Sequence, residues 1–153
     1  MQTIKENIAI VIPCYNEEKT IKQVILKFQK DMPEAKIYVC NNSSSDNTKQ
    51  IALDSGAIVF DEFHKGKANA VENLFKNVDA DYYILTDGDM TYDSSVSNNA
   101  ISFLKKSKAD MLIGVRRPFS NNKEIYRPGH KFGNRAFTFI LKSMFSGNLK
   151  DVL

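Results

Sequence analysis

The chain contains few cysteines, and this scarcity limits the kinds of site that it can build. Only Cys14 and Cys40 occur among its 153 residues, and neither has a second cysteine or a histidine at the spacing of metal ligands. Each ends an apolar run that predicts a buried strand. We therefore expect two free thiols in a reducing cytosol rather than a metal site.

Long apolar runs and long runs of like charge are also missing from the sequence. No stretch approaches the roughly 18 to 20 apolar residues that cross a bilayer, so we expect no transmembrane segment in this chain. Pro13 ends the apolar run near the N-terminus and no small-residue cleavage site follows, which favours a strand over a signal peptide. With a net charge of +3 and no basic run, nucleic acid is not an expected partner. The expected location is the cytoplasm, with the inner face of the cytoplasmic membrane as the alternative.

What the sequence does contain is an alternation of short apolar runs with stretches of helical period. This pattern is typical of a parallel sheet with crossover helices, so the expected fold class is α/β, with a Rossmann-like, mostly parallel sheet and helices on both faces. Strands are predicted over residues 8–12, 36–40, 57–60, 82–86 and 110–115. Helices are predicted after the first strand, from Ser45 or Asp46 to about Gly56, over 66–77 and over 94–106.

The first of these helices has the clearest pattern. Its apolar residues Ile21, Val24, Ile25 and Phe28 are spaced i, i+3, i+4 and i+7, which puts them on one face. Asn16 is its predicted N-cap. The helix over 94–106 is expected to bury the apolar residues Val96, Ala100, Phe103 and Leu104.

The alternation stops near Arg116, so we divide the chain into an α/β core over 1–117 and a second part over 118–153. The second part reads as a basic, aromatic-rich loop followed by a helix from about residue 131 to 145. Eight lysines or arginines and one acid lie between Arg116 and Lys150. Such a segment suits an anionic membrane surface or a lipid phosphate; alternatively, its aromatic residues close a face of the sheet while its basic residues stay in water.

Ligands of open α/β sheets bind beyond the carboxyl ends of the strands, which directs attention to the loops that follow each predicted strand. The loop after the fourth strand is DGDMTYD, where Asp87 and Asp89 offer oxygen ligands of the kind that Mg²⁺ or Mn²⁺ prefers, and Gly88 allows a close approach of the backbone. Two aspartates separated by one residue are by themselves weak evidence for a metal site, because Asp79 and Asp81 form the same pattern before that strand. The alternative is a turn in which these carboxylates bond to the backbone.

Three other loops offer groups that suit a nucleotide. Tyr15 can stack on a base or ribose and Glu17 can accept a hydrogen bond from either, while Asn41 and Asn42 follow the second strand, where bases are commonly recognised. For each of these residues a cap, a packed ring or a turn is the alternative. In the third loop, Lys65 and Lys67 can meet phosphate oxygens, although lysines at a helix start are often simply exposed.

Taken in order, five segments resemble the family 2 glycosyltransferases, and most closely the polyprenyl-phosphate and dolichol-phosphate sugar synthases. They are IAIVIPCYNEEKTI, IYVCNNSSSDNT, GKANAVENLF, ADYYILTDGDMTYD and DMLIGVRRP. The resemblance implies the GT-A fold, a nucleoside-diphosphate sugar as donor and Mg²⁺ or Mn²⁺ as cofactor. It also implies a nucleotide pocket lined by Pro13, Tyr15 and Glu17, a base site with Asn41 and Asn42, a metal between Asp87 and Asp89, and Arg116 facing the phosphates.

Two departures from the family pattern stand out. The family commonly has Asp at the position of Asn41, so the charge of that group is missing here. The family continues past the point where this sequence stops at Leu153, and no acid lies between Glu124 and Asp151 to act as the usual downstream base. We therefore interpret the chain as the front part of a longer enzyme, with residues 1–117 as its nucleotide-sugar-binding core and 118–153 as the start of its acceptor-binding or membrane-proximal part.

The expected function is metal-dependent transfer of a sugar from its nucleoside diphosphate to an acceptor, with a polyprenyl phosphate as one candidate because a phosphate needs no general base. Two alternatives remain open at this point. A haloacid-dehalogenase-type phosphatase would use Asp87 as nucleophile and Asp89 as acid and base. The other alternative is a catalytically inactive nucleotide-binding fragment.

Overall fold

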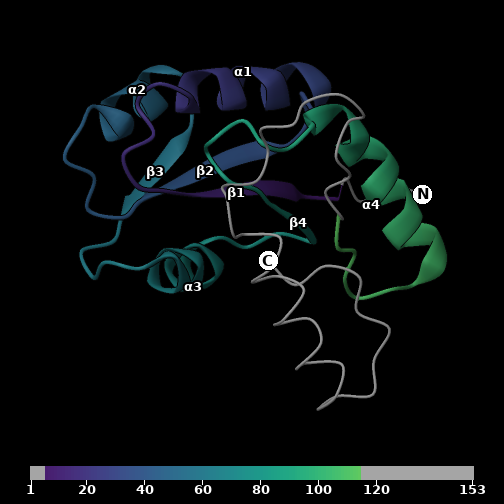
Figure 1. The fold of residues 1–153 in the computed structure, drawn as a ribbon. Coiled ribbons are helices and arrows are strands. Elements are labelled where there is room, and N and C mark those ends of the chain that lie inside the picture. Colours follow the sequence, from purple (N-terminus) through teal and green to yellow (C-terminus); the bar gives the residue numbers. More distant parts are fainter. Residues whose placement is uncertain (1–5, 115–153) are drawn as a thin grey trace, which may run out of the picture. The chain divides into compact units, whose positions relative to one another are not determined.

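The computed structural model describes residues 6–114, so the predictions for Arg116 and for the segment 118–153 lie outside the described residues. The contacts between residues set a boundary after Asp110. The elements appear in Figure 1. In chain order they are β1 (Ile8–Cys14), α1 (Ile21–Asp31), β2 (Lys36–Asn41), α2 (Thr48–Asp54), β3 (Ile58–Asp61), α3 (Lys67–Asn77), β4 (Tyr82–Leu85), the 3₁₀ turn η1 (Ser94–Val96) and α4 (Ser97–Ser107).

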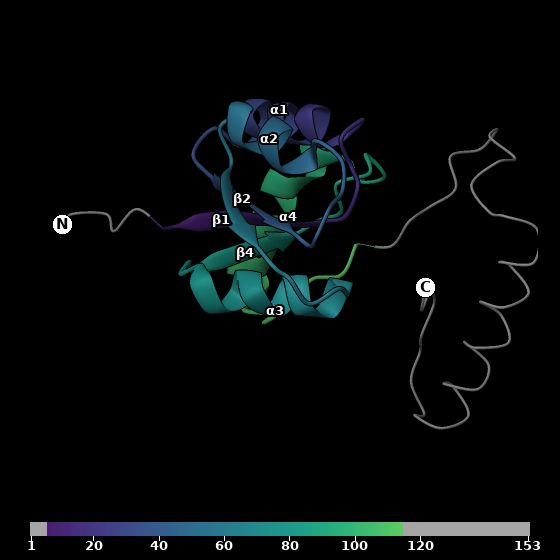
Figure 2. The ribbon, with the colours of Figure 1, turned by 90° about the vertical axis from the view of Figure 1, so that its left-hand side faces the viewer.

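The four strands form one parallel sheet in the order β3-β2-β1-β4. Strand β1 lies between β2 and β4 and is buried from Ala9 to Cys14, which explains why its sequence is almost continuously apolar rather than alternating. Helices α1 and α2 cover one face of the sheet and α3 covers the other (Figure 2). The predicted fold class, an α/β parallel sheet with helices on both faces, is therefore confirmed.

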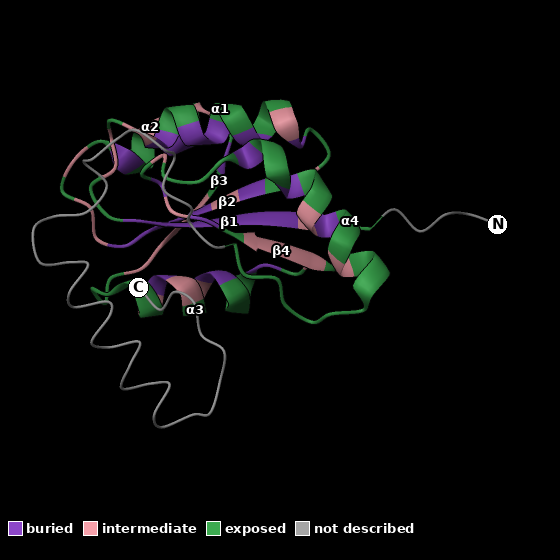
Figure 3. Cartoon of the chain, turned by 45° about the vertical axis from the view of Figure 1, so that its right-hand side comes forward, coloured by how far each residue is buried: buried purple, intermediate pink, exposed green. Residues whose placement is uncertain are grey.

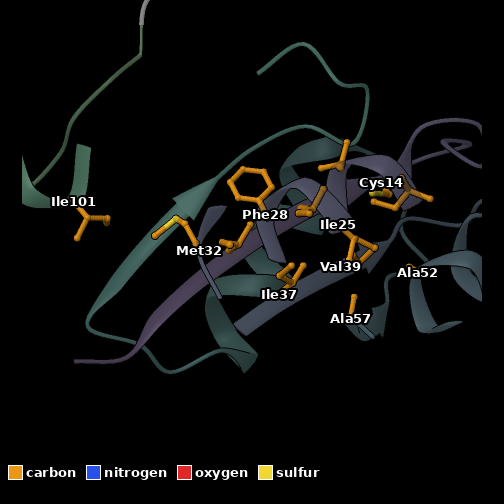
Figure 4. Packing of buried hydrophobic residues seen from close by; sticks show 13 residues of the cluster. Cys14, Ile25, Phe28, Met32, Ile37, Val39, Ala52, Ala57 and Ile101 are labelled. Atoms are coloured by element: carbon orange, nitrogen blue, oxygen red, sulfur yellow. The ribbon is translucent and has the colours of Figure 1, made fainter. Parts of the chain in front are cut away.

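Successive residues of β1 pack alternately into two separate hydrophobic clusters, one on each face of the sheet. Ile10 and Ile12 pack in a cluster with the inner face of α1, whereas Ala9 and Val11 pack in a second cluster with Ala70 and other residues of α3. Figure 4 shows the larger cluster, which includes Phe28 and Ile25 of α1 and Ile37 and Val39 of β2. This two-sided burial fixes the strand, and so it fixes the loop that leaves its carboxyl end.

The predicted face of α1 is confirmed, because Ile21, Val24, Ile25 and Phe28 are all buried. The predicted N-cap is wrong. The helix begins at Ile21, and Asn16 has a φ of 55° in the turn before it, where its side chain contacts a different loop. A residue type that caps helices also suits the left-handed region, and here the turn uses it.

The predicted face of the helix over 94–106 is only partly right, because Ala100 and Leu104 are half-buried but the other two predicted residues are not. Residues Ser94, Ser97 and Ile101 are buried, while Val96 and Phe103 are each more than half exposed. Figure 3 shows the largely exposed surface of α4.

The reason for this rotation is a polar contact between helices. The Ser94 hydroxyl donates to Asp31 Oδ2 at 2.6 Å, and Asn98 Nδ2 donates to the carbonyl oxygen of Asp31 at 2.7 Å. These bonds turn the polar side of the segment toward the end of α1. Apolar periodicity therefore did not decide the orientation of α4.

The predicted strand over residues 110–115 is not found in its described part, because residues 110–114 adopt no strand. Met111 is 73% exposed and Ile113 is 75% exposed. An apolar run becomes a strand only when a neighbouring strand accepts its backbone hydrogen bonds, and β4 pairs only with β1 within the described chain.

Candidate functional site

A cleft of about 450 Å³ lies at the carboxyl end of the sheet. Its walls come from the loop after β1, the end of β2, the loop before α3 and the loop after β4. Its lining residues are Pro13, Cys14, Tyr15, Glu17, Asn42, Lys65, Gly66, Lys67, Ala70, Asp87, Gly88 and Asp89. Loops that are distant in the sequence therefore meet at one site, as the parallel topology requires.

Most of the predicted site residues line this cleft. They are Pro13, Tyr15, Glu17, Asn42, Lys65, Lys67, Asp87, Gly88 and Asp89. Asn41 is not among the lining residues, and Arg116 lies outside the part of the chain that the structure describes. Gly66 lines the cleft between the two lysines, and Cys14 and Ala70 line it without having been predicted.

Asp87 is the first carboxylate after β4, and it is paired with a lysine. Lys67 Nζ lies 2.5 Å from Asp87 Oδ1. The Asp87 side chain is 21% exposed and that of Lys67 is 63% exposed, so the carboxylate is partly sheltered while the lysine reaches in from the surface. The pair joins the start of α3 to the loop after β4 across the cleft.

Asp89 is held differently. Its Oδ1 accepts a hydrogen bond from the Thr91 backbone N–H at 3.0 Å and another from the Thr91 hydroxyl at 2.6 Å. The turn expected as the alternative for this carboxylate is therefore present. It leaves the cleft position of Asp89 unchanged, so the turn and a ligand role are compatible.

The donor set of the cleft fits a hard divalent cation that is only partly held by protein. Asp87 and Asp89 provide carboxylate oxygens, the ligands that Mg²⁺ and Mn²⁺ prefer. Within residues 6–114 no group of three or more acidic, histidine or cysteine side chains is arranged to hold a metal. Such a cation would take its remaining ligands from water and from the oxygens of a phosphate.

Gly88 brings the loop after β4 against the loop after β1. A Cβ added to Gly88 would lie 2.9 Å from the Cys14 Sγ and 3.4 Å from the Glu17 Cγ. Any side chain at this position would push the two loops apart. Burial also raises the pKa of the Cys14 thiol, so this sulfur is a neutral packing group and not a thiolate.

The turn after β1 and the turn after β2 bind each other through side-chain to backbone hydrogen bonds. The Thr48 hydroxyl accepts from the backbone N–H of Glu17 at 2.7 Å and lies 2.5 Å from Asp46 Oδ1, to which it donates. Asp46 Oδ2 accepts from the Glu18 N–H at 3.2 Å. In the opposite direction, Asn16 Oδ1 accepts from the Ser45 N–H at 2.8 Å. Each turn therefore satisfies backbone groups of the other.

Glu17 is held in the cleft by this arrangement. Its Oε2 accepts from the Thr20 hydroxyl at 3.2 Å. Burial raises the pKa of this carboxyl group, and the charges of Asp89 and Asp87 raise it further. A cation bound in the cleft would offset this repulsion and stabilise the charged form of Glu17.

Asn42 braces the loop between β3 and α3. Its Nδ2 donates to the carbonyl oxygens of His64 at 2.7 Å and of Glu62 at 3.3 Å, and its Oδ1 accepts from the Gly66 N–H at 2.7 Å. Gly66 has a φ of 135°, which favours glycine at this point. The amide of Asn42 thus shapes the wall that presents Lys65 and Lys67.

Asn41 directs its side chain toward the neighbouring strand. Its Nδ2 donates to Asp61 Oδ1 at 3.0 Å, and Lys49 Nζ lies 2.5 Å from Asp61 Oδ2. The hydrogen bond from Asn41 and the interaction with Lys49 lower the pKa of the Asp61 carboxyl group. The amide at position 41 therefore stands beside a charged carboxylate supplied by β3.

Tyr15 forms the outer wall and is 51% exposed. The ammonium of Lys65 lies 5.8 Å from the centroid of its ring, within the range of a cation–π contact. An aromatic face, two lysines and a carboxylate pair thus surround one cleft at the carboxyl edge of a parallel sheet. Such a set of groups could bind an anionic ligand that carries an aromatic ring.

Comparison with known proteins gives the family. Residues 9–152 match the model of glycosyl transferase family 2, which covers nearly the whole chain. The chain therefore belongs to glycosyl transferase family 2, and its class of chemistry is that of the glycosyltransferases.

Similar curated proteins include RfbJ of Shigella flexneri, which is 46% identical over 125 residues, covering 82% of this chain and 96% of that protein. The glycosyltransferase AglJ of Haloferax volcanii is 34% identical over 138 residues, covering 87% of this chain and 45% of AglJ. The chain thus spans nearly all of RfbJ but less than half of AglJ.

Solved structures support the fold. Glucosyl-3-phosphoglycerate synthase from Mycobacterium tuberculosis, crystallised with Mn²⁺ and UDP-glucose, superposes with a TM-score of 0.58 at 23% identity. The match covers 65% of this chain and 39% of that enzyme. At this identity the likeness establishes the shared architecture.

Proposed function

We propose that this chain binds a nucleoside-diphosphate sugar with the help of Mg²⁺ or Mn²⁺ and takes part in the transfer of the sugar to an acceptor. The observation that carries the proposal is the position of Asp87 and Asp89. They follow β4 at the carboxyl edge of the sheet and line the same cleft as Lys65, Lys67 and an aromatic wall. The chance pair Asp79 and Asp81, by contrast, precedes β4 at the other end of the strand.

Each wall of the cleft has a proposed role. Tyr15 stacks on the base or ribose, Glu17 accepts a hydrogen bond from the nucleoside, and Pro13 shapes the floor. Asn42 acts by holding the loop that carries Lys65 and Lys67, and these lysines meet the phosphate oxygens. Asn41 contributes to the base end through its contact with Asp61. Arg116 is proposed as a further phosphate contact on the basis of the family pattern.

Asp87 and Asp89 are proposed to hold the metal, which when bound neutralises the charge that develops on the departing diphosphate. Asp89 is already oriented by Thr91. Gly88 lets both carboxylates approach the loop after β1, where the nucleoside is expected. The chain thus brings the phosphate-binding and nucleoside-binding walls together.

For the acceptor we propose a polyprenyl phosphate, used at the inner face of the cytoplasmic membrane. A phosphate acceptor is already an anion, so its attack needs no general base. The basic, aromatic composition of 118–153 suits such a lipid or the membrane surface. Within residues 6–114 no helix is long and apolar enough to cross a membrane.

The phosphatase alternative loses its support. Its signature would place DGDMT after the first strand of the domain, whereas this segment follows β4, and the family match is to glycosyltransferases. The alternative of an inactive nucleotide-binding fragment is an outcome of the test that follows.

Calorimetric titration with UDP, GDP and their sugars, with and without Mn²⁺, tests the proposal. We expect metal-dependent binding in the wild type, loss of that dependence in Asp89→Ala, and normal binding in the matched control Asp79→Ala. Absence of nucleotide binding would overturn the proposal. Binding without transfer to polyprenyl phosphate or to a hydroxyl acceptor would identify an inactive nucleotide-binding fragment.

A further inference from the structure

We propose that Lys67 couples metal binding to diphosphate binding by occupying the cation position at Asp87 until the diphosphate enters. This inference rests on the proposed function, since it assumes that Asp87 and Asp89 hold the metal. It assigns to Lys67 a role beyond a phosphate contact. The residue acts first as a competitor of the metal and then as a partner of the ligand that the metal binds.

The first observation is the ion pair itself. Lys67 Nζ lies 2.5 Å from Asp87 Oδ1, and both residues line the cleft. Mg²⁺ would bind a carboxylate oxygen at about 2.0 to 2.1 Å, so the ammonium and the metal compete for the same position. The metal cannot take Oδ1 while the ammonium remains where it is.

The second observation is the difference between the two carboxylates. Asp89 is held by Thr91, which donates two hydrogen bonds to one oxygen and adds no charge. Asp87 instead faces a cation. Metal binding at Asp87 Oδ1 therefore requires a change of partner, whereas Asp89 keeps the orientation that Thr91 gives it.

The third observation is the exposure of the competing group. Lys67 is the first residue of α3, and its side chain is 63% exposed. A lysine ammonium on a flexible four-carbon stem can leave a carboxylate without any backbone movement. Its backbone is meanwhile held near the cleft, because Asn42 fixes the preceding residue Gly66.

The coupling follows from charge. Metal alone would displace the ammonium and leave two cations close together in a small cleft, which costs electrostatic free energy. A diphosphate removes this cost, since its oxygens can bind the metal and the displaced ammonium at the same time. Nucleotide should therefore strengthen metal binding, and metal should strengthen nucleotide binding by the same factor.

Lys65 provides a matched control. It lines the same cleft, but its ammonium lies over the Tyr15 ring, 5.8 Å from the centroid. Its removal takes one positive charge from the cleft without breaking the ion pair of Asp87 with Lys67. A general effect of charge would appear in both variants, and competition for Asp87 would appear only in Lys67→Met.

The experiment measures Mn²⁺ affinity by the electron paramagnetic resonance signal of unbound Mn²⁺, using the full chain with and without UDP or GDP. In Lys67→Met we expect tighter binding of Mn²⁺ alone, by about fivefold, and a smaller enhancement by the nucleotide. Lys65→Met, which removes a proposed phosphate contact, should weaken nucleotide binding, but it should tighten the binding of Mn²⁺ alone much less than Lys67→Met does. Lys67→Arg, which preserves the cation, should keep most of the coupling.

The possible failures are distinct. If the wild type binds Mn²⁺ more tightly with nucleotide but Lys67→Met behaves like the wild type, the coupling role of Lys67 is wrong and the proposed function stands. If the wild type binds no Mn²⁺ even with UDP or GDP, the proposed function fails first. Circular dichroism of each variant confirms that the fold is kept.

Discussion

The hydroxyl of Thr48 accepts a hydrogen bond from the backbone N–H of Glu17 at 2.7 Å, and this bond links two turns that are 31 residues apart in the sequence. Thr48 is completely buried at the start of α2. A residue that never touches the cleft thus sets the position of one that lines it.

Replacement of this threonine by valine should lower both stability and nucleotide affinity. Thr48→Val keeps the shape but leaves the Glu17 N–H without its acceptor, which is expected to cost about 1 to 3 kcal/mol of unfolding free energy. Thr48→Ser keeps the hydroxyl and should lose only about 1 kcal/mol through the missing methyl group. Urea unfolding and nucleotide titration provide the measurements, and equal affinity of the two variants would contradict the positioning role.

The close contact at Gly88 predicts that even one added methyl group is destabilising. In Gly88→Ala the new Cβ would lie 2.9 Å from the Cys14 Sγ, so the loops must separate, at an expected cost of about 1 to 3 kcal/mol. Gly114→Ala is the matched control, because no atom lies within 4 Å of a Cβ at that position. Thermal unfolding measures both, and Cys14→Ala added to Gly88→Ala should recover part of the loss.

The pair of Asn41 and Asp61 predicts a dependence of stability on pH. Folding lowers the pKa of the Asp61 carboxyl group below its unfolded value of about 3.9. The charged carboxylate therefore stabilises the folded protein fully above that value, and this stabilisation is lost as the pH falls through the pKa of the folded state. Asn41→Asp would put two carboxylates side by side and raise the pKa of one. The variant should therefore be less stable than the wild type by the largest amount near pH 7, where both groups are charged. The difference should shrink toward pH 5, as one carboxylate takes up a proton.

Urea unfolding at pH 5 and pH 7 checks this expectation. The exchange Asn41→Asp with Asp61→Asn restores one amide and one carboxylate, and it should recover most of the stability at pH 7. A deficit in Asn41→Asp that is the same at both pH values would show that repulsion between carboxylates is not its cause.

Asn42 predicts a local effect on the loop before α3. Asn42→Asp removes both amide donors and directs a carboxylate at the carbonyl oxygens of Glu62 and His64, which should cost about 1 to 3 kcal/mol. We expect faster amide exchange at residues 62–66 by hydrogen-exchange mass spectrometry. Asn99→Asp, at an exposed position of α4, should leave exchange in that loop unchanged.

The sheet and the strand ends could be predicted from the sequence because they depend on local apolar patterns and on general topology. The face of α1 was predicted by the spacing of four apolar residues, and all four are buried. The orientation of α4 could not be predicted in this way. It depends on hydrogen bonds from Ser94 and Asn98 to Asp31, more than sixty residues earlier in the chain.

In the candidate site, too, some features could be predicted from local sequence and others depend on contacts between distant residues. The position of Asp87 and Asp89 at a strand end was enough to place them in the cleft. The partners that orient the site were missed, because Thr48 and Asp46 act through the backbone of another loop. The segment NNSSSDNT did contain these residues, but short polar side chains in a loop have many local uses.

The cleft combines two kinds of contact that respond differently to salt. Its walls are joined largely by hydrogen bonds from amides and hydroxyls, such as those of Asn42 and Thr48, whereas the contact across its mouth between Lys67 and Asp87 is ionic and partly exposed. At 1 M ionic strength the Debye length is about 3 Å, so the ionic contact weakens while the walls stay joined. The protein would then keep the outline of its site but lose part of its preference for a charged ligand.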